Sequence, residues 1–230
     1  MLRYMDKNLK PKISVVIPCY EMSGKGVDFL ARAIDSIESQ TFKNYEIVIA
    51  DNSDDNLIED FVKGKNLVYF KNPRKGMAQN TNEAMTHANG ELIKILYQDD
   101  CLSHDNALEE IVDIFTDDVN WLATGCIHNE GGENVRPHYP SYTHEIYKGM
   151  NTIGSPSVIT LRNKDLILFD EKMTWLLDVD YYRRMYDKYG EPKFLYKINV
   201  VMGLGKHQVT NLLAETLKRA EYDYMMKKYE

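Results

Sequence analysis

Short apolar runs alternate with segments of helical periodicity through the first half of this 230-residue chain. The first run, ISVVI at 13–17, is continuous and rich in β-branched residues, as is typical of a strand buried on both faces of a sheet. Phe29, Ala33 and Ile37 then recur at a spacing that predicts a helix over 27–39. The same alternation predicts strands at 45–50, 67–71, 91–97 and 120–124, and helices at 56–63, 77–88 and 106–115.

Four strand-helix alternations within the first 125 residues predict an α/β fold, Rossmann-like, with a mostly parallel central sheet and helices on both faces. The segment 128–151 is rich in Gly, Pro, His and Tyr without a clear period, and it predicts a long loop. Further strands are expected at 157–161 and 193–202, and helices at 175–189 and 212–229. We therefore expect one domain, in which 1–125 form the main α/β portion and 126–230 add a small C-terminal lobe.

Acidic side chains follow several of the predicted strands. Tyr20 and Glu21 lie just beyond the first strand, Asp51 ends the second, and Gln98, Asp99 and Asp100 end the fourth. Because the carboxyl ends of parallel strands meet at the edge where open α/β sheets bind ligands, we expect these residues in one crevice. Asp99 and Asp100 repel each other unless a cation or a proton lies between them, which suggests a Mg or Mn site. The alternative is that Asp100 caps a helix that starts near His104.

Two further positions at this edge suit a nucleotide. Asp51 lies where a carboxylate accepts hydrogen bonds from the N–H of a base or from a ribose hydroxyl, as acids do in nucleotide-binding α/β folds. Gly76 lets the backbone approach a ligand closely. Arg74 or Lys75, beside the N-terminus of the helix over 77–88, suits an anion such as a diphosphate, although a solvated turn is the alternative.

Composition excludes several classes of protein. With 43% hydrophobic and 27% charged residues the chain is expected to be globular, and its net charge of −7 offers no broad basic face for a nucleic-acid backbone. Cys19, Cys101 and Cys126 lack a C-x-x-C spacing, which favours reduced thiols in a cytoplasmic protein over a disulfide or zinc framework. No apolar leader is present, and no run approaches the roughly 20 residues that cross a bilayer. Peripheral membrane attachment and a homodimer stay open.

Four motifs in order resemble the family 2 glycosyltransferases, which have the GT-A fold. ISVVIPCYE is similar to the family's first strand with its Pro-x-Tyr-Asn start, and SIESQTFKNYEIVIADNS to its Gln-Thr helix end, second strand and Asp-Asp-Gly-Ser turn. GMAQNTNEAMTHANGELIKIL is similar to the Gly-x-x-x-Ala-x-Asn helix and the strand that follows it, and LYQDD stands in the place of the Asp-x-Asp metal motif. The resemblance covers roughly residues 12–211.

The resemblance implies roles for particular residues. The donor nucleotide would be bound by Pro18, Tyr20, Glu21, Asp51, Arg74, Gly76, Gln98 and Asp99. Asp99, with Asp100 beside it and His207 from a late loop, would hold a divalent metal, Mn or Mg. Asp178 stands where inverting members of the family carry their general base. Residues 1–125 would then bind the nucleotide-sugar, and 126–230 would bind the acceptor and supply the base.

Three departures from the family's pattern matter for the chemistry. Ala50, Tyr97 and Leu177 replace the first acid of the Asp-Asp-Gly-Ser turn, of the Asp-x-Asp motif and of the catalytic pair, respectively. In each pair the second acid is present, and that is the acid that the chemistry needs most.

The resemblance therefore implies an inverting glycosyltransferase that moves a sugar from a nucleoside diphosphate, UDP foremost, to an acceptor hydroxyl. The acceptor would be a glycan, as in polysaccharide biosynthesis, a lipid-linked saccharide, or another hydroxyl compound; a nucleic acid is not the expected acceptor. Two alternatives stay open: a degenerate relative that binds a nucleotide-sugar without chemistry, motivated by Tyr97, and a sugar nucleotidyltransferase. The nucleotidyltransferase would need a Gly-rich, basic loop after the first strand, for which Gly24-Lys25-Gly26 is short.

Overall fold

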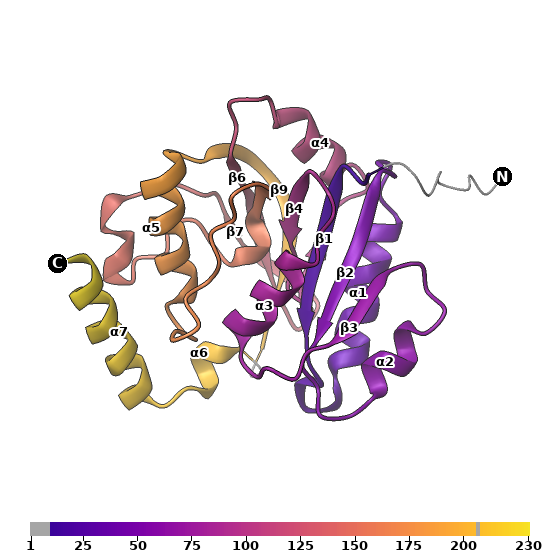
Figure 1. Ribbon diagram of the computed structural model, residues 1–230, viewed down its shortest axis with the longest axis horizontal. Coiled ribbons are helices and arrows are strands. Elements are labelled where there is room, and N and C mark those ends of the chain that lie inside the picture. The colour runs from indigo at the N-terminus through magenta and orange to yellow at the C-terminus, as the bar shows by residue number, and fades with distance from the viewer. Residues whose placement is uncertain (1–9, 206–207) are drawn as a thin grey trace.

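The computed structural model describes residues 10–205 and 208–230. One curled sheet runs through the described chain, and helices pack on both of its faces (Figure 1). Its strands are β1 (Ile13–Cys19), β2 (Tyr45–Asp51), β3 (Val68–Lys71), β4 (Leu92–Ile95), β5 (Cys101–Leu102), β6 (Trp121–Glu130), β7 (Glu133–His138), β8 (Ile159–Arg162) and β9 (Lys193–Leu204). The helices are α1 (Gly26–Glu38), α2 (Leu57–Val62), α3 (Met77–Thr86), α4 (Ala107–Ile114), α5 (Leu177–Tyr189), α6 (Val209–Leu212) and α7 (Glu215–Tyr229), with short 3₁₀ helices η1 (Met22–Gly24), η2 (His144–Lys148) and η3 (Pro156–Val158).

The strand order brings the carboxyl ends of β1, β2 and β4 together. The order is β3-β2-β1-β4-β8-β6-β9-β5, with β7 paired to β6. β1 to β4 are parallel throughout, and β8 then runs antiparallel between β4 and β6. The expected α/β class is confirmed, and β6 crosses from the first predicted portion of the chain into the second, so that both portions share one sheet.

Both faces of the first half of the sheet are covered by helices. Val15 and Ile17 of β1 pack with α1, α2 and α4, whereas Val16 packs on the other face with α3 and α5. Every residue of β1 is buried, which explains why the strand is a continuous apolar run rather than an alternating one. Among the described helices, none combines the length and the apolar content that crossing a membrane requires.

The expectation of a long loop over 128–151 is wrong for 128–138. β6 continues to Glu130, turns at Gly131 and Gly132, and returns as β7, which forms a hairpin with β6 (Figure 1). Residues 139–151 form no strand and contain only the short helix η2. Both glycines have positive φ, which a tight hairpin turn commonly requires. Sequence periodicity does not reveal β7 because the strand is exposed along nearly its whole length, and no buried face imposes an alternation on its residues.

Asn80 of α3 holds the strand ends in place. Its side-chain amide donates to the carbonyl oxygens of Cys19 and Ala50, at 3.0 and 2.9 Å, and its Oδ1 accepts from Asn72 at 3.1 Å. Asn80 is only 3% exposed, so water is not available to replace these bonds. One side chain thus fixes α3 against the carboxyl ends of β1 and β2 and against the loop that follows β3.

We predict that Asn80→Ala lowers the free energy of unfolding by about 1–3 kcal/mol, because it removes three buried hydrogen bonds. Thr86→Ala, at the exposed end of the same helix, is the matched control and should change stability by no more than about 0.5 kcal/mol. Urea denaturation measures both variants. Equal losses in the two would contradict the role given to Asn80.

Candidate functional site

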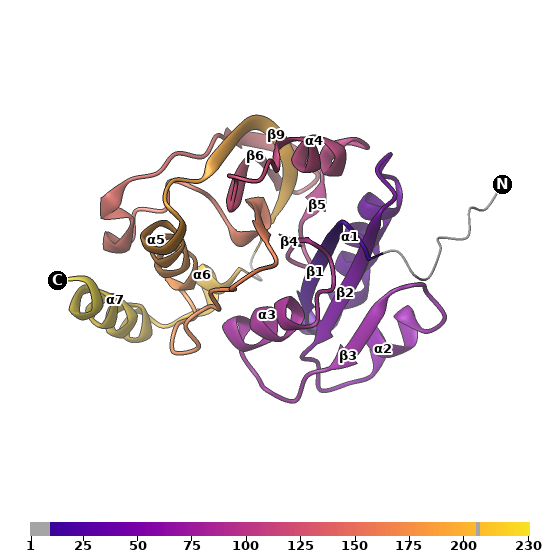
Figure 2. The same cartoon turned by 45° about the horizontal axis from the view of Figure 1, so that its top comes forward.

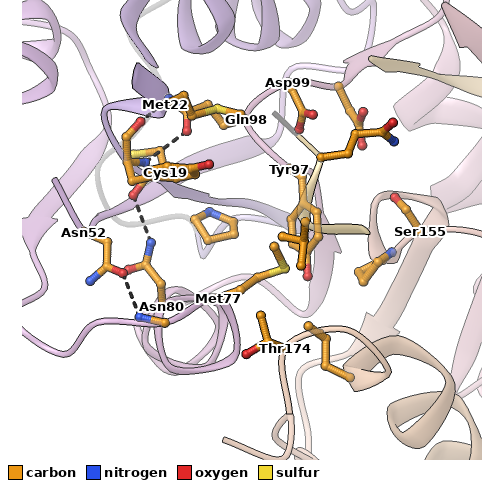
Figure 3. A pocket seen from close by; sticks show the side chains of 18 of the residues that line it. Cys19, Met22, Asn52, Met77, Asn80, Tyr97, Gln98, Asp99, Ser155 and Thr174 are labelled. Carbon is orange, nitrogen blue, oxygen red and sulfur yellow. Dashed lines mark hydrogen bonds between the residues drawn. The ribbon is translucent and has the colours of Figure 1, made fainter. Parts of the chain in front are cut away.

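A cavity of about 470 Å³ opens at the shared edge of β1 and β4, which is in the size range of small-molecule sites. It is bounded by the segments that follow these strands, by the start of α3, by the start of α5 and by β9. Figure 3 shows Tyr97, Gln98 and Asp99 on the segment after β4, with Thr174 across the cavity from Gln98 and Asp99. Of the predicted site residues, the cavity brings together Pro18, Tyr20, Glu21, Gly76, Gln98, Asp99, Asp100 and Asp178.

Gln98 fixes the loop that follows β1. Its Oε1 accepts from the backbone N–H of Tyr20 at 3.0 Å, and its Nε2 donates to the carbonyls of Tyr20 and Gly26 at 3.0 and 2.7 Å. A Cβ atom on Gly26 would lie 2.4 Å from the Tyr20 carbonyl oxygen, so only glycine fits this close approach. Gln98 therefore shapes the cavity by holding Tyr20 and Glu21 in position, since its amide is already bonded to the protein.

Asp99 and Asp100 form an acidic pair at the end of β4. Asp99 is half-buried and lines the cavity, whereas Asp100 is 3% exposed and its Oδ1 accepts from the backbone N–H of Gly203 at 3.0 Å. Burial, and next the charge of Asp99, raise the pKa of Asp100 to about 8. β9 can come this close only because residue 203 is glycine. A Cβ at this position would lie 2.6 Å from the carbonyl oxygen of Asp99.

The acidic pair fits a divalent cation. Two carboxylates are oxygen ligands of the kind that Mg²⁺ and Mn²⁺ take, and a cation would favour the ionised form of Asp100, which burial and the charge of Asp99 disfavour. Glu21 adds a buried carboxylate oxygen, Oε2, without a hydrogen-bond partner in the described chain. Within residues 10–205 and 208–230 no three acidic, His or Cys side chains converge as a metal-binding group. The predicted ligand His207 lies outside the described residues.

Asp178 reaches the same cavity from the first turn of α5. Its Oδ1 accepts from the backbone N–H of Val179 at 2.7 Å, and its Oδ2 accepts from Asn151 Nδ2 at 2.6 Å. Burial raises the pKa of Asp178 to about 6, against the lowering effect of these hydrogen bonds. A carboxylate with this pKa is ionised at neutral pH and is more basic than an ordinary aspartate, as a general base requires.

Asp51 and Arg74 are not brought to the cavity. Asp51 is fully buried, and its oxygens accept from Ser53, from Tyr69 Oη at 2.9 Å and from Lys71 Nζ at 3.1 Å. These donors are all protein groups, and the buried carboxylate is not exposed to a ligand in the cavity. Arg74 turns outward to form ion pairs with Glu83 and Glu171.

Asn52 occupies the place that was expected for Asp51, and of the two basic residues expected beside α3, Lys75 lines the cavity and Arg74 does not. Asn52 lines the cavity and ties two loops together: its Nδ2 donates to the carbonyls of Asn72 and Arg74, and its Oδ1 accepts from Gly76 N–H at 3.1 Å. Lys75 lines the same end and pairs with Asp54 at 2.6 Å. Asn52 stands where the Asp-Asp-Gly-Ser pattern has glycine, and this departure was the sequence feature that could have identified Asn52 as a site residue. No sequence feature pointed to Asn151, which lies in a segment without periodicity.

A family model described as glycosyl transferase family 2 matches residues 14–184. The chain belongs to glycosyl transferase family 2. Among curated relatives, a GalNAc(5)-diNAcBac-PP-undecaprenol beta-1,3-glucosyltransferase of Campylobacter jejuni is 33% identical over 97 residues, which cover 39% of this chain and 30% of the relative. Matches to several such relatives span about a third of their own length.

Solved structures share the fold. TarS 1–349 of S. aureus in complex with UDP has a TM-score of 0.67 at 18% identity, and the match covers 95% of this chain and 70% of that one. Mannosyltransferase PcManGT from Pyrobaculum calidifontis, in complex with GDP-Man and Mn²⁺, has a TM-score of 0.63 at 15% identity, covering 87% of this chain and 59% of that one. The family 2 chain therefore has the fold of the GT-A glycosyltransferases.

We predict that Asn151→Ala raises the pKa of Asp178 above its value of about 6, because the variant loses a hydrogen bond that favours the ionised carboxylate. A ¹³C NMR titration of the Asp178 carboxyl measures the change. Asn134→Ala, on exposed β7, serves as the control and should leave this pKa where it is. A pKa that stays put or falls in Asn151→Ala would contradict the assigned contact.

Proposed function

We propose that this protein is an inverting glycosyltransferase that moves a sugar from a nucleoside diphosphate to an acceptor hydroxyl. The observation that carries the proposal is that one cavity holds two kinds of acid from separate elements: the Asp99–Asp100 pair at the end of β4 and Asp178 at the start of α5. A pair suited to a cation and a separate base suited to a hydroxyl are the two groups that this reaction needs.

The donor nucleotide would lie along the ends of β1 and β2. Tyr20, Glu21, Asn52, Lys75 and Gly76 line this end of the cavity and offer a ring, hydrogen-bonding groups and a positive charge. Lys75 and the N-terminus of α3 suit the negative charge of a nucleotide. A uridine nucleotide is the first choice, in keeping with the UDP bound by TarS, and the GDP-Man bound by PcManGT makes guanosine the second.

Asp99 and Asp100 would hold Mn²⁺ or Mg²⁺ together with oxygens of the diphosphate, and we keep His207 as a proposed further ligand. When bound, the ion would act as a Lewis acid that offsets the charge on the departing nucleoside diphosphate. The chain contributes the placement of the pair. Gly203 N–H holds Asp100 while Gln98, next in sequence to Asp99, is bonded to the β1 loop.

Asp178 would take the proton from the acceptor hydroxyl as that hydroxyl attacks the anomeric carbon. Inversion requires attack from the face opposite the leaving group, with the hydroxyl oxygen about 3 Å from the base. Asn151 and the Val179 N–H hold the carboxylate in one orientation. For the acceptor we favour a saccharide, free or linked to a lipid, because the Campylobacter relative is named for a substrate of the second kind.

We predict that Asp178→Asn lowers the rate of transfer by about 10²- to 10⁴-fold, because an amide cannot accept the hydroxyl proton. Nucleotide affinity should not change, because Asp178 acts on the acceptor. In the parent protein the rate should rise with pH through about 6, as Asp178 loses its proton, and should then level off. Release of the nucleoside diphosphate from a panel of sugar nucleotides measures the rate and its pH dependence, and calorimetric titration with the nucleoside diphosphate measures the affinity.

Asp187→Asn is the matched control, since Asp187 lies on the same helix and pairs with Arg183 at 3.0 Å away from the cavity. Near-normal turnover in Asp178→Asn would remove Asp178 from the mechanism. A parent protein that binds a nucleotide but neither transfers nor hydrolyses any sugar nucleotide would be the degenerate binder. Release of pyrophosphate from a nucleoside triphosphate and a sugar phosphate would instead identify a nucleotidyltransferase.

A further inference from the structure

A carboxylate of the C-terminal helix holds the backbone just before the candidate base. Glu221 of α7 accepts hydrogen bonds from three consecutive backbone N–H groups, those of Thr174 at 2.9 Å, Trp175 at 2.8 Å and Leu176 at 3.0 Å. Thr174 and Trp175 line the cavity, and α5 begins at Leu177, directly after the last residue bound by Glu221. Two elements far apart in sequence therefore meet at the edge of the site, and Figures 1 and 2 both show α7 beside α5.

The N-cap residue of α5 supplies no cap, and within the first turn Asp178 itself accepts from the N–H of Val179. Leu176, the residue that precedes the helix, offers no side-chain hydrogen bond to it, and its own N–H is one of those bound by Glu221. Backbone N–H groups at a helix start need an acceptor, and a negative charge is favourable there because of the helix dipole. Glu221 supplies a negative charge near the start of α5 and an acceptor for the N–H of Leu176, the residue before the helix.

Other contacts brace the same segment from α7. Lys228 Nζ lies 2.8 Å from Asp170 and 2.7 Å from Asp180, and Tyr229 Oη donates to Asp180 at 2.7 Å. Asp170 precedes the segment held by Glu221 and Asp180 follows it, so α7 holds both of its ends. Glu221 holds the backbone two residues before Asp178, and Lys228 and Tyr229 hold the side chain of Asp180, two residues after it.

We propose that Glu221 is a positioning residue for Asp178. It fixes the backbone at 174–176 and thereby the first turn of α5, which carries the Asp178 carboxylate into the cavity. The kinetic consequence rests on the proposed function, in which Asp178 is the general base. The structural consequence does not depend on any activity.

The charge of Glu221 also acts on Asp178. A neighbouring negative charge disfavours the ionised carboxylate, so Glu221 contributes to the raised pKa of Asp178. Within the described part of the chain, the hydroxyls of Tyr97, from the segment after β4, and of Tyr182, on α5, also interact with Asp178. Neither is ionised at neutral pH, because burial raises the pKa of both. Glu221 is thus the negative charge whose removal should lower the pKa of Asp178.

The test uses Glu221→Gln and Glu221→Ala in the full chain. Glutamine keeps the size of the side chain but replaces one acceptor oxygen with an NH₂ group, which cannot accept from a backbone N–H. Asp223→Asn is the matched control: it removes one acid from the same helix at an exposed ion pair with Arg219. Thermal unfolding establishes that each variant folds, and a variant that does not fold is replaced by the other.

Two structural readouts need no activity. In Glu221→Gln, hydrogen-deuterium exchange of the amides at 174–176 should become at least about tenfold faster than in the parent, and the ¹³C-detected pKa of Asp178 should fall. Asp223→Asn should change neither. Unchanged exchange together with an unchanged pKa in Glu221→Gln would overturn the proposal, whatever reaction the protein performs.

The kinetic readout separates positioning from general damage. We expect kcat for transfer to fall by about 10- to 100-fold in Glu221→Gln, with KM for the sugar nucleotide unchanged and with the acid limb of the pH profile moved to lower pH. A rise in KM at constant kcat would overturn the proposal. If the parent protein transfers no sugar, the proposed function fails, and the exchange and pKa measurements still decide the role of Glu221.

Discussion

The burial of the Asp100 carboxyl beside Asp99 is the constraint on which the rest of the site depends. Parallel pairing of β1 and β4 sets this acidic pair at a shared sheet edge, where Asp100 is buried and Asp99 is half-buried. Burial first, and the charge of Asp99 next, raise the pKa of Asp100. In the proposed function a cation would offset both effects and would also favour an anionic ligand such as a diphosphate.

The surrounding polar side chains serve mainly to hold backbone segments in place. Gln98 fixes the β1 loop, Asn80 and Asn52 fix the ends of β2 and β3, and Glu221 fixes the start of α5. Each replaces a bond to water with a bond that joins two distant segments of the chain. The cavity is therefore preorganised, which lets binding energy act on the ligand rather than on ordering the loops.

The sequence predicted much of the fold because β1 to β4 are buried on both faces and their helices are amphipathic, so that local pattern and tertiary position agree. It failed for β7, whose exposed residues carry no period. For the site, the sequence identified the cavity residues that directly follow β1 and β4, because their position depends only on where each strand ends. Asp51 was misplaced because its partners Tyr69 and Lys71 come from another strand, and Glu221 was missed because its contact spans 45 to 47 residues.

The most direct measurement of the account is a thermal-shift titration with UDP, GDP, dTDP and CMP, each with and without Mn²⁺, on the parent protein, on Asp99→Asn and on the control Asp113→Asn at an exposed position of α4. We predict that one nucleoside diphosphate at 100 times its Kd adds about 2.7 kcal/mol of stability with Mn²⁺ present. Asp99→Asn should lose this effect and Asp113→Asn should keep it. Equal stabilisation with and without Mn²⁺, or an undiminished effect in Asp99→Asn, would contradict the account.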